Sequence, residues 1–144
     1  MFDFKEKVVL ITGASYGLGE HFAYDFARAG ADLILTARSV ELLEDVGARC
    51  REMGSRVAVI PGDVSVEADV KNVISAGIEA LGRIDVLINN AGIFGPVAMQ
   101  TLEELDYNTF VDVMAVNVYG PLKISQSFAD NVVASEQKKI VTIT

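Results

Sequence analysis

A glycine-rich turn is the part of this sequence whose residue types and spacing point most directly to chemistry. An apolar run leads into residues 12–19, which read TGASYGLG. Gly13 permits a tight exit from a strand, Gly17 removes a side chain where an anion must approach the backbone, and Gly19 allows the following helix to pack closely. The N–H groups and positive dipole end of that helix favour phosphate. A tight turn in some other α/β protein is the alternative, but the flanking strand and helix favour a pyrophosphate site.

Two later motifs place polar or small residues directly after predicted strands. Asp63 precedes Val64, and its carboxylate is a good acceptor for an amine such as adenine N6. Capping of the next helix is the alternative role of Asp63, but Ser65 is better placed for it. Residues 89–92 read NNAG, and their small side chains leave room for a ribose and a nicotinamide ring. Asn89 is expected to tie neighbouring backbone together, while the three residues after it face the ligand.

The end of the second predicted strand bears on which dinucleotide is bound. An NAD site usually has an acidic residue there, which accepts from the ribose 2′-hydroxyl. In this sequence Ala37 takes that place and Arg38 follows it, and a guanidinium is a good partner for a 2′-phosphate. A solvated loop charge is the alternative role of Arg38. The pattern favours NADP, with NAD as the alternative cofactor.

These motifs sit within a regular alternation of short apolar runs and amphipathic stretches. Short apolar runs rich in β-branched residues are typical of buried parallel strands, and apolar residues spaced three and four apart indicate helices. The alternation predicts an α/β fold of the Rossmann type, a doubly wound parallel sheet of five strands in the order 3-2-1-4-5 with helices on both faces. The predicted strands are residues 7–12, 32–36, 56–60, 84–88 and 139–144, and the predicted helices are residues 17–29, 39–53, 107–134 and a stretch that begins after residue 65.

Particular residues set the expected ends and faces of the helices. Ser39 and Ser65 are expected to cap the second and third helices, and residues 101–104 have the form of a capping box before the fourth. Pro121 lies inside the last helical stretch, where its missing N–H predicts a kink or break. Asn117 lies on an otherwise apolar face of that stretch, and a buried asparagine is costly unless its amide is hydrogen-bonded. The apolar stripe of the first helix is expected to comprise Leu18, Phe22, Phe26 and Ala29.

Together the motifs resemble those of the short-chain dehydrogenase/reductase family, and the resemblance covers the whole chain. It rests on the TGASYGLG turn, the Asp63-Val64 pair, the NNAG segment and Asn117. The resemblance implies an NAD(P)-dependent oxidoreductase that transfers a hydride between the nicotinamide and a small carbonyl or alcohol substrate. NADP-binding members often carry a basic residue where this turn has Tyr16. The predicted cofactor-binding residues are Gly13, Ser15, Tyr16, Gly17, Leu18, Gly19, Arg38, Asp63, Val64, Asn90, Ala91 and Gly92.

The family's catalytic groups are a serine just after the fifth strand and a Tyr-x-x-x-Lys on the next helix, with the tyrosine as acid and base. The resemblance places the serine one residue beyond Thr144, so Thr144 is its neighbour and not its substitute. None of the chain's tyrosines is assigned as the catalytic acid, because they lie in other elements. Asn117 is the catalytic residue predicted within the chain. It either bonds the backbone, or holds a water of the proton relay as the family's asparagine does, or does both. No metal ligands are assigned.

By this resemblance the chain corresponds to the first half of a family domain. Family members usually run to about 250 residues, within the range of one α/β domain, whereas this chain has 144. We expect an incomplete NAD(P)-binding Rossmann domain, a fragment that lacks the sixth and seventh strands, binds cofactor weakly and catalyses nothing alone. Residues 139–144 would then form an apolar sheet edge. The helix at residues 107–134 matches the family's main dimer-forming helix, which implies a homodimer or homotetramer.

Composition narrows the possible partners and the location. The formal net charge is −8, so nucleic-acid partners are disfavoured. No apolar run approaches the length of a membrane span. The first seven residues lack the apolar core of a signal peptide, and a cytoplasmic protein is expected. Cys50 is the only cysteine and is expected to be a small core side chain.

Two other functional classes compete with the oxidoreductase. A non-catalytic module would bind the dinucleotide as a signal and would bind it tightly without turnover. An S-adenosylmethionine methyltransferase also uses a glycine turn after its first strand. It normally needs an acid at the end of the second strand, where this chain has Ala37, and the NNAG segment has no role in it.

Overall fold

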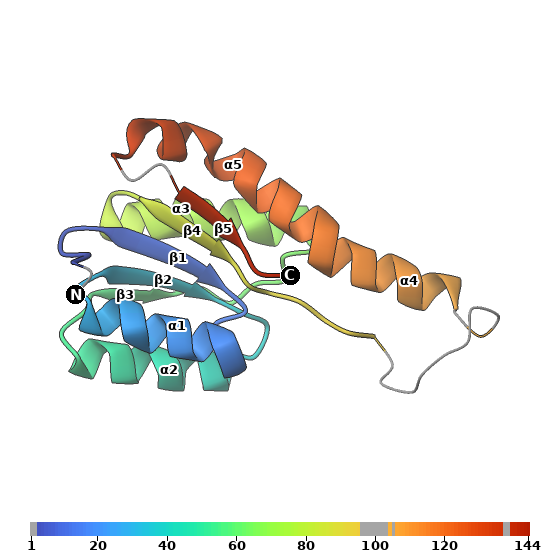
Figure 1. The fold of residues 1–144 in the computed structure, drawn as a ribbon, viewed down its shortest axis with the longest axis horizontal. Helices are drawn as coiled ribbons and strands as arrows, with labels where there is room; N and C mark the ends of the chain where they lie inside the picture. The colour runs from blue at the N-terminus through green and yellow to red at the C-terminus, as the bar shows by residue number, and fades with distance from the viewer. Residues whose placement is uncertain (1–2, 96–103, 105, 137–138) are drawn as a thin grey trace.

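Five parallel strands form one sheet with helices on both faces (Figure 1). The computed structural model describes residues 3–95, 104, 106–136 and 139–144. The strand order is β3-β2-β1-β4-β5, which confirms the predicted fold class and topology. Along the chain the elements are β1 (Val8–Thr12), α1 (Gly17–Arg28), β2 (Asp32–Thr36), α2 (Val40–Glu52), β3 (Val57–Val59), α3 (Glu67–Leu81), β4 (Val86–Asn89), α4 (Tyr107–Met114), the π-helical segment η1 (Ala115–Tyr119), α5 (Gly120–Ala134) and β5 (Lys139–Thr142).

The central strands are apolar throughout because helices cover both of their faces. All five residues of β1 are buried, as are four of the five in β2. On the face covered by α1 and α2, Val9 and Ile11 pack with Val86 of β4. On the opposite face, Val8 and Leu10 pack with residues of α3 and α5. Figure 1 shows these two layers, with α1 and α2 below the sheet and α3 and α5 above it.

Helix α1 packs against the sheet through small residues, not through the predicted stripe of larger ones. Its buried residues are Gly19, Ala23 and Ala27. Leu18, which was expected in the stripe, is 61% exposed. Small side chains bring the helix axis closer to the strands, which leaves Phe22 and Phe26 only partly buried at the edge of this core. The prediction of Cys50 as a core residue is confirmed, because it is buried in the same cluster.

Two of the predicted helix caps are wrong in detail. Helix α3 begins at Glu67 with Val66 as its N-cap residue, whereas Ser65 was expected to cap it. Ser65 instead donates from both its N–H and its hydroxyl to Asp63 Oδ1, at 2.8 and 2.7 Å. Ser39 occupies the predicted N-cap position of α2, yet its side chain makes no capping hydrogen bond.

The beginning of α4 is fixed by a residue that the sequence reading did not single out. Asp106 is the N-cap residue, and its Oδ2 accepts from the Thr109 N–H at 2.9 Å. Of the capping box predicted at residues 101–104, residues 101–103 lie outside the described residues, so that prediction is not tested.

The predicted break at Pro121 takes the form of a widened helical turn just before it. The helix runs from α4 through η1 into α5, and the Gly120 N–H donates to the carbonyl of Ala115, five residues back. Pro121 has no N–H for the Asn117 carbonyl four residues earlier, so ordinary α-helical pairing is impossible there. The wide turn also presses Gly120 against the loop after β3. A Cβ on Gly120 would lie 2.8 Å from Val64 Cγ2.

The last strand is exposed along its length. In the described part of the chain β5 pairs only with β4, as expected for a strand at the edge of the sheet. Within those same residues, no helix is both long and apolar enough to cross a bilayer.

Candidate cofactor site

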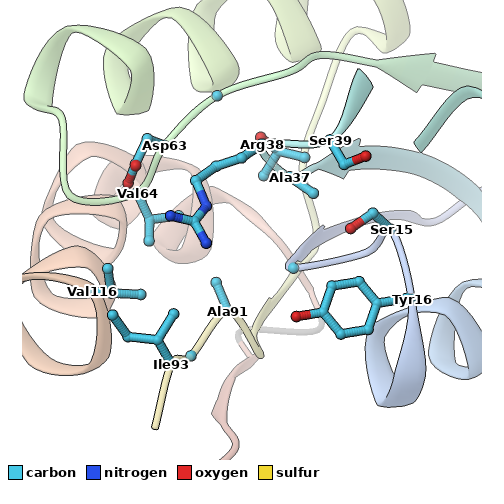
Figure 2. A pocket seen from close by; sticks show the side chains of 14 residues that line it. Ser15, Tyr16, Ala37, Arg38, Ser39, Asp63, Val64, Ala91, Ile93 and Val116 are labelled. Carbon is cyan, nitrogen blue, oxygen red and sulfur yellow. The ribbon is translucent and has the colours of Figure 1, made fainter. Parts of the chain in front are cut away.

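A cavity of about 140 Å³ opens at the carboxyl ends of β1, β2 and β4 (Figure 2). Ligands of doubly wound sheets bind at this edge, beside the point where strand order reverses. Here β1 pairs with β2 on one side and β4 on the other, so the reversal point lies at the glycine turn. The lining residues come from the ends of the three strands, the loop after β3 and the helix after β4: Gly13, Ser15, Tyr16, Thr36, Ala37, Arg38, Ser39, Gly62, Asp63, Val64, Ala91, Gly92, Ile93 and Val116.

The glycine turn has the geometry that its spacing predicts. Gly13 and Gly17 both have left-handed φ values, of 64° and 63°. Gly19 is buried where α1 crosses the turn, and a Cβ there would overlap the carbonyl oxygen of Gly13. The Ala14 N–H donates to the Thr36 carbonyl at 3.2 Å, which fixes the turn to the end of β2. The turn therefore presents its backbone to the cavity with no side chain in the way at Gly13.

A buried hydroxyl that the sequence reading left out joins this turn to the loop after β4. Thr12 Oγ1 accepts from the N–H groups of Asn90 and Ala91, both at 3.0 Å. The same side chain is 1% exposed. The Asn90 amide returns the contact by donating to the carbonyls of Thr12 and Gly13, at 3.1 and 3.2 Å. Asn90 thus holds the turn from behind and is not among the residues that line the cavity.

Asn89 has a different role from the one predicted. Its Nδ2 donates to Ser125 Oγ on α5 at 3.2 Å, so its side chain contacts another side chain and not neighbouring backbone. The backbone-tying role belongs to Asn90. Residue type could not separate these roles. They differ because successive residues of a strand point to opposite faces of the sheet.

The end of β2 presents cationic and hydroxyl groups to the cavity. Ala37 is 8% exposed, and its methyl group leaves space where a longer acid would project. Arg38 is exposed, and in the described part of the chain no ion pair or hydrogen bond is recorded for its guanidinium. Figure 2 shows the Arg38 side chain extending across the cavity toward Val64. Ser39, which was not predicted as a site residue, adds a hydroxyl at the N-terminus of α2.

Asp63 lies on the cavity wall with one carboxylate oxygen already engaged. Its Oδ1 accepts from the N–H and hydroxyl of Ser65, and its own N–H donates to Asp69 Oδ2 at 2.9 Å. These bonds shape the loop between β3 and α3. The cofactor role and the local turn role of Asp63 are therefore compatible, because no bond is recorded in this part of the chain for the Oδ2 atom of Asp63.

Asn117 clamps the loop after β4. The Ile93 N–H donates to Asn117 Oδ1 and the Asn117 Nδ2 donates to the Ile93 carbonyl, both at 2.8 Å. The predicted structural hydrogen bond to the backbone is thus present. The expectation of a buried side chain is wrong, since Asn117 is exposed. η1 carries this side chain out toward the loop, while Val116 beside it is buried and lines the cavity.

One part of the predicted site lines the cavity, and another part does not. The predicted residues that line the cavity are Gly13, Ser15, Tyr16, Arg38, Asp63, Val64, Ala91 and Gly92. The predicted residues that do not line it are Gly17, Leu18, Gly19, Asn90 and Asn117. The lining residues outside the prediction are Thr36, Ala37, Ser39, Gly62, Ile93 and Val116. Most of these directly follow or precede a predicted residue, and this adjacency was the available signal.

Tyr119 and Lys123 have the i, i+4 spacing of a Tyr-x-x-x-Lys pair, although they precede β5. The Lys123 ammonium lies 5.2 Å from the centroid of the Tyr119 ring. Neither residue is among those that line the cavity. Their spacing therefore gives a cation–π contact on the helix surface. Tyr119 lies in η1, before β5, whereas the resemblance gives the catalytic tyrosine to the helix after the fifth strand.

A doubly wound parallel sheet with a glycine turn after β1 and a cavity at the strand ends defines the Rossmann class of nucleotide-binding fold. Within that class, residues 7–144 match the family model described as short chain dehydrogenase. The chain belongs to this family of oxidoreductases.

The curated relatives that this chain matches are longer than the chain itself. It is 44% identical over 140 residues to 11-beta-hydroxysteroid dehydrogenase-like 3 of Arabidopsis thaliana, which covers 96% of this chain and 44% of the relative. It is 39% identical over 124 residues to an uncharacterized oxidoreductase of Thermotoga maritima, which covers 86% of this chain and 47% of the relative. The chain therefore spans less than half the length of these two proteins.

Solved structures of the same family superpose closely on this fold. A metagenomic short-chain oxidoreductase in complex with NADP matches with a TM-score of 0.90 at 29% identity, over 98% of this chain and 63% of that one. A short chain dehydrogenase/reductase from Burkholderia phymatum in complex with NAD matches with a TM-score of 0.90 at 34% identity, over 99% of this chain and 50% of that one. Both nicotinamide dinucleotides thus occur among its structural neighbours.

Proposed function

We propose that this chain is the NADP-binding part of an oxidoreductase that transfers a hydride between nicotinamide C4 and the carbonyl or alcohol carbon of a small molecule. The observation that carries the proposal is the end of β2, where Arg38 reaches into the cavity beside the small Ala37. A guanidinium that has no protein partner among the described residues is suited to a 2′-phosphate. An acid at position 37, which would suit a ribose hydroxyl, is lacking.

The residues present fit a dinucleotide along the whole edge of the sheet. The N-terminus of α1 would hold the pyrophosphate through its N–H groups, because Gly13 leaves the backbone open there. Asp63 and Val64 would contact the adenine, and Ala91 and Gly92 would leave space for the second ribose and the nicotinamide. A Cβ on Gly92 would meet no atom closer than 3.5 Å, so this part of the wall is open.

The cofactor supplies the hydride chemistry, and this chain's residues supply its placement. Asn117 fixes the Ile93 backbone on the cavity wall, which holds the loop that carries Ala91 and Gly92. In the proposed enzyme Asn117 also holds a water of the proton relay. The serine, tyrosine and lysine that act on the substrate are assigned to the part of the protein beyond Thr144, so residues 1–144 by themselves should turn nothing over.

The same proposal includes assembly into a homodimer or homotetramer. The helix formed by α4, η1 and α5 exposes apolar side chains along one side, with Tyr107 75% and Val118 51% exposed. Association through this helix would remove that surface from water.

The test measures NADPH and NADH dissociation constants on wild-type protein and two variants at the end of β2. Arg38→Ala should weaken NADPH binding about tenfold or more, because a charge-assisted contact is lost, and change NADH binding less than about twofold. Ala37→Asp should reverse the preference, because a carboxylate repels the 2′-phosphate and accepts from a ribose hydroxyl. Equal loss of both nucleotides in Arg38→Ala would contradict the NADP assignment. Tight NADPH binding without carbonyl reduction by the whole protein would favour the sensing module.

A further inference from the structure

Gly120 is a glycine inside a helix whose backbone does not require one. Its φ and ψ angles are −55° and −58°, values that alanine adopts freely, and alanine is the better helix former. The residue is buried where η1 passes into α5. A Cβ on Gly120 would lie 2.8 Å from Val64 Cγ2 and 3.1 Å from both Val64 Cβ and the Val64 carbonyl oxygen. The glycine is therefore explained by the lack of space at Val64 and not by backbone conformation.

Val64 meets this glycine on one side and lines the cavity on the other. Figure 2 shows its side chain on the cavity wall. The residues before it are tied to other elements. The Gly62 N–H donates to the Ala37 carbonyl at 3.1 Å, and the Asp63 N–H donates to Asp69 Oδ2 on α3 at 2.9 Å. Because this part of the loop is held from behind, a push from the helix displaces the Val64 side chain toward the cavity.

The helix is held on both sides of Gly120. Three residues earlier, Asn117 exchanges two 2.8 Å hydrogen bonds with Ile93. Four residues later, Ile124 is 1% exposed and packs in the core with residues of α3. A closely packed segment fixed at two points has little freedom to move away from a neighbour. The distance between this turn of helix and Val64 is therefore set by the absence of a side chain at Gly120.

We propose that Gly120 is a positioning residue for the nucleotide, because its missing side chain keeps Val64 back from the cavity and leaves room for the adenine ring. The inference rests on the proposed NADP binding, in which Asp63 and Val64 contact the adenine. In Gly120→Ala the added methyl group moves Val64 into the space of the ring. The same turn of helix holds Ile93 through Asn117, so one turn sets the placement of two loops that line the cavity.

The test compares two ligands on the whole protein. NADPH binding is followed by nicotinamide fluorescence. Adenosine 2′,5′-bisphosphate, which has the adenine and the ribose phosphate but no nicotinamide, is measured by its competition with NADPH. Gly120→Ala should weaken both ligands about fivefold, because both carry the adenine. Wild-type affinity for NADPH in Gly120→Ala overturns the inference, and so does a loss for NADPH that the bisphosphate does not share.

Gly77 supplies a matched control for the added methyl group. It is buried in α3, and a Cβ there would lie 2.7 Å from Ile34 Cδ1, which is as close as the approach to Val64. Ile34 does not line the cavity. Gly77→Ala should therefore lower the urea midpoint, as Gly120→Ala does, and leave both dissociation constants within about twofold of wild type. Equal loss of affinity in the two variants would assign the effect to destabilisation and overturn the inference.

Relief of the overlap is a second measurement, and it applies even if Gly120→Ala does not fold. Val64→Ala removes Cγ2, the atom nearest to the added methyl group, and leaves contacts of 3.1 Å that a small shift relieves. The double variant Gly120→Ala/Val64→Ala should bind NADPH within about twofold of Val64→Ala. Full additivity of the two changes overturns the inference.

The results also separate this inference from the proposed function. Wild-type protein that binds NADPH, together with a Gly120→Ala variant that binds it equally well, overturns the positioning role and leaves the proposed function standing. Failure of the wild-type protein to bind NADPH overturns both.

Discussion

Asn117 and Ile93 hold each other through a pair of 2.8 Å hydrogen bonds, with one side chain serving both the N–H and the carbonyl of a single backbone unit. The amide does this from η1, where the helical turn is widened before Pro121. These hydrogen bonds fix the distance between the loop after β4 and the helix that begins with α4, more than a dozen residues after Ile93. The cavity wall at Ile93 is set by this pair.

Replacement of Asn117 should loosen that wall. Asn117→Ala removes both hydrogen bonds and should lower the free energy of unfolding by about 1 kcal/mol, because the site is solvent-exposed and water replaces the lost partners. Cofactor affinity should fall by several fold as the loop becomes less ordered. Urea denaturation and NADPH titration measure the two effects. Asn72→Ala, an exposed asparagine on α3, is the matched control and should change neither. Unchanged NADPH affinity in Asn117→Ala would contradict the role of the Asn117–Ile93 hydrogen bonds in shaping the site.

Thr12 should be more sensitive to loss of its hydroxyl than to loss of its methyl group. Thr12→Val keeps the shape but leaves the N–H groups of Asn90 and Ala91 without the acceptor they now have. The expected cost is roughly 2–4 kcal/mol, the desolvation penalty of two such donors. Thr12→Ser retains the acceptor and should cost about 1 kcal/mol. Equilibrium urea unfolding measures the stability of both variants. Equal destabilisation by Thr12→Val and Thr12→Ser would show that packing, and not hydrogen bonding, accounts for the contribution of Thr12.

Gly19 and Gly92 should respond differently to the same added methyl group. In Gly19→Ala the new Cβ would overlap the Gly13 carbonyl oxygen, so α1 must move away from the turn at a cost of about 3 kcal/mol. In Gly92→Ala the nearest atom is Asn117 Oδ1 at 3.5 Å, an ordinary contact, and the cost should stay within about 0.5 kcal/mol. Thermal unfolding of the two variants compares them. A Gly19→Ala protein as stable as wild type would refute the close helix packing described for this turn.

Asp85 should make the fold sensitive to acid. This residue is buried at the start of β4, where Oδ2 accepts from the Val8 N–H at 2.9 Å and Oδ1 from Ser135 Oγ at 2.9 Å, and Arg83 forms an ion pair with it. Burial alone would raise the pKa of Asp85, but the contacts with Arg83, Val8 and Ser135 outweigh it and lower the pKa. The charged form is therefore favoured by the folded state.

The sign of the pH dependence follows from that lowered pKa. The stabilising contribution is fully present above the unfolded-state pKa of about 3.9, and it is lost as pH falls through the lower folded-state pKa. Urea midpoints between about pH 2 and pH 7 should fall more steeply toward acid for wild type than for Asp85→Asn. Asp130→Asn, an exposed carboxyl on α5, should follow the wild-type curve. A wild-type slope in Asp85→Asn would contradict the assignment.

The order of the strands and helices could be predicted from the local sequence pattern. The roles of individual side chains could not, because they depend on contacts that the local pattern does not contain. Strands β1 and β2 are recognisable because burial on both faces demands unbroken apolar runs. The apolar stripe of α1 was misplaced because the small residues Ala23 and Ala27, which pack closest, carry little hydrophobic signal. Leu18 carries a strong signal and lies in solvent.

In the site, residue type indicated which residues line the cavity better than it indicated their contacts. Arg38 and Asp63 were found because charge after a strand is conspicuous, and both line the cavity. Asn89 and Asn90 are identical in type, and only the alternation of the strand decides which one faces the turn. Thr12 was passed over because a threonine at a strand end is common, and its two accepted hydrogen bonds come from a loop about 78 residues away.

The position of β1 in the middle of the sheet has a consequence for how the protein is made. Val9 pairs with Val86 of β4, which is 86 − 9 = 77 residues later in the chain. At a synthesis rate of roughly 5–20 residues per second, β1 leaves the ribosome on the order of 4–15 seconds before that neighbour exists. During this interval β1 can pair with β2 along one edge, while the edge that β4 will occupy is unpaired. We therefore expect the newly made chain to depend on chaperones until β4 emerges, and to aggregate when synthesis stalls before it.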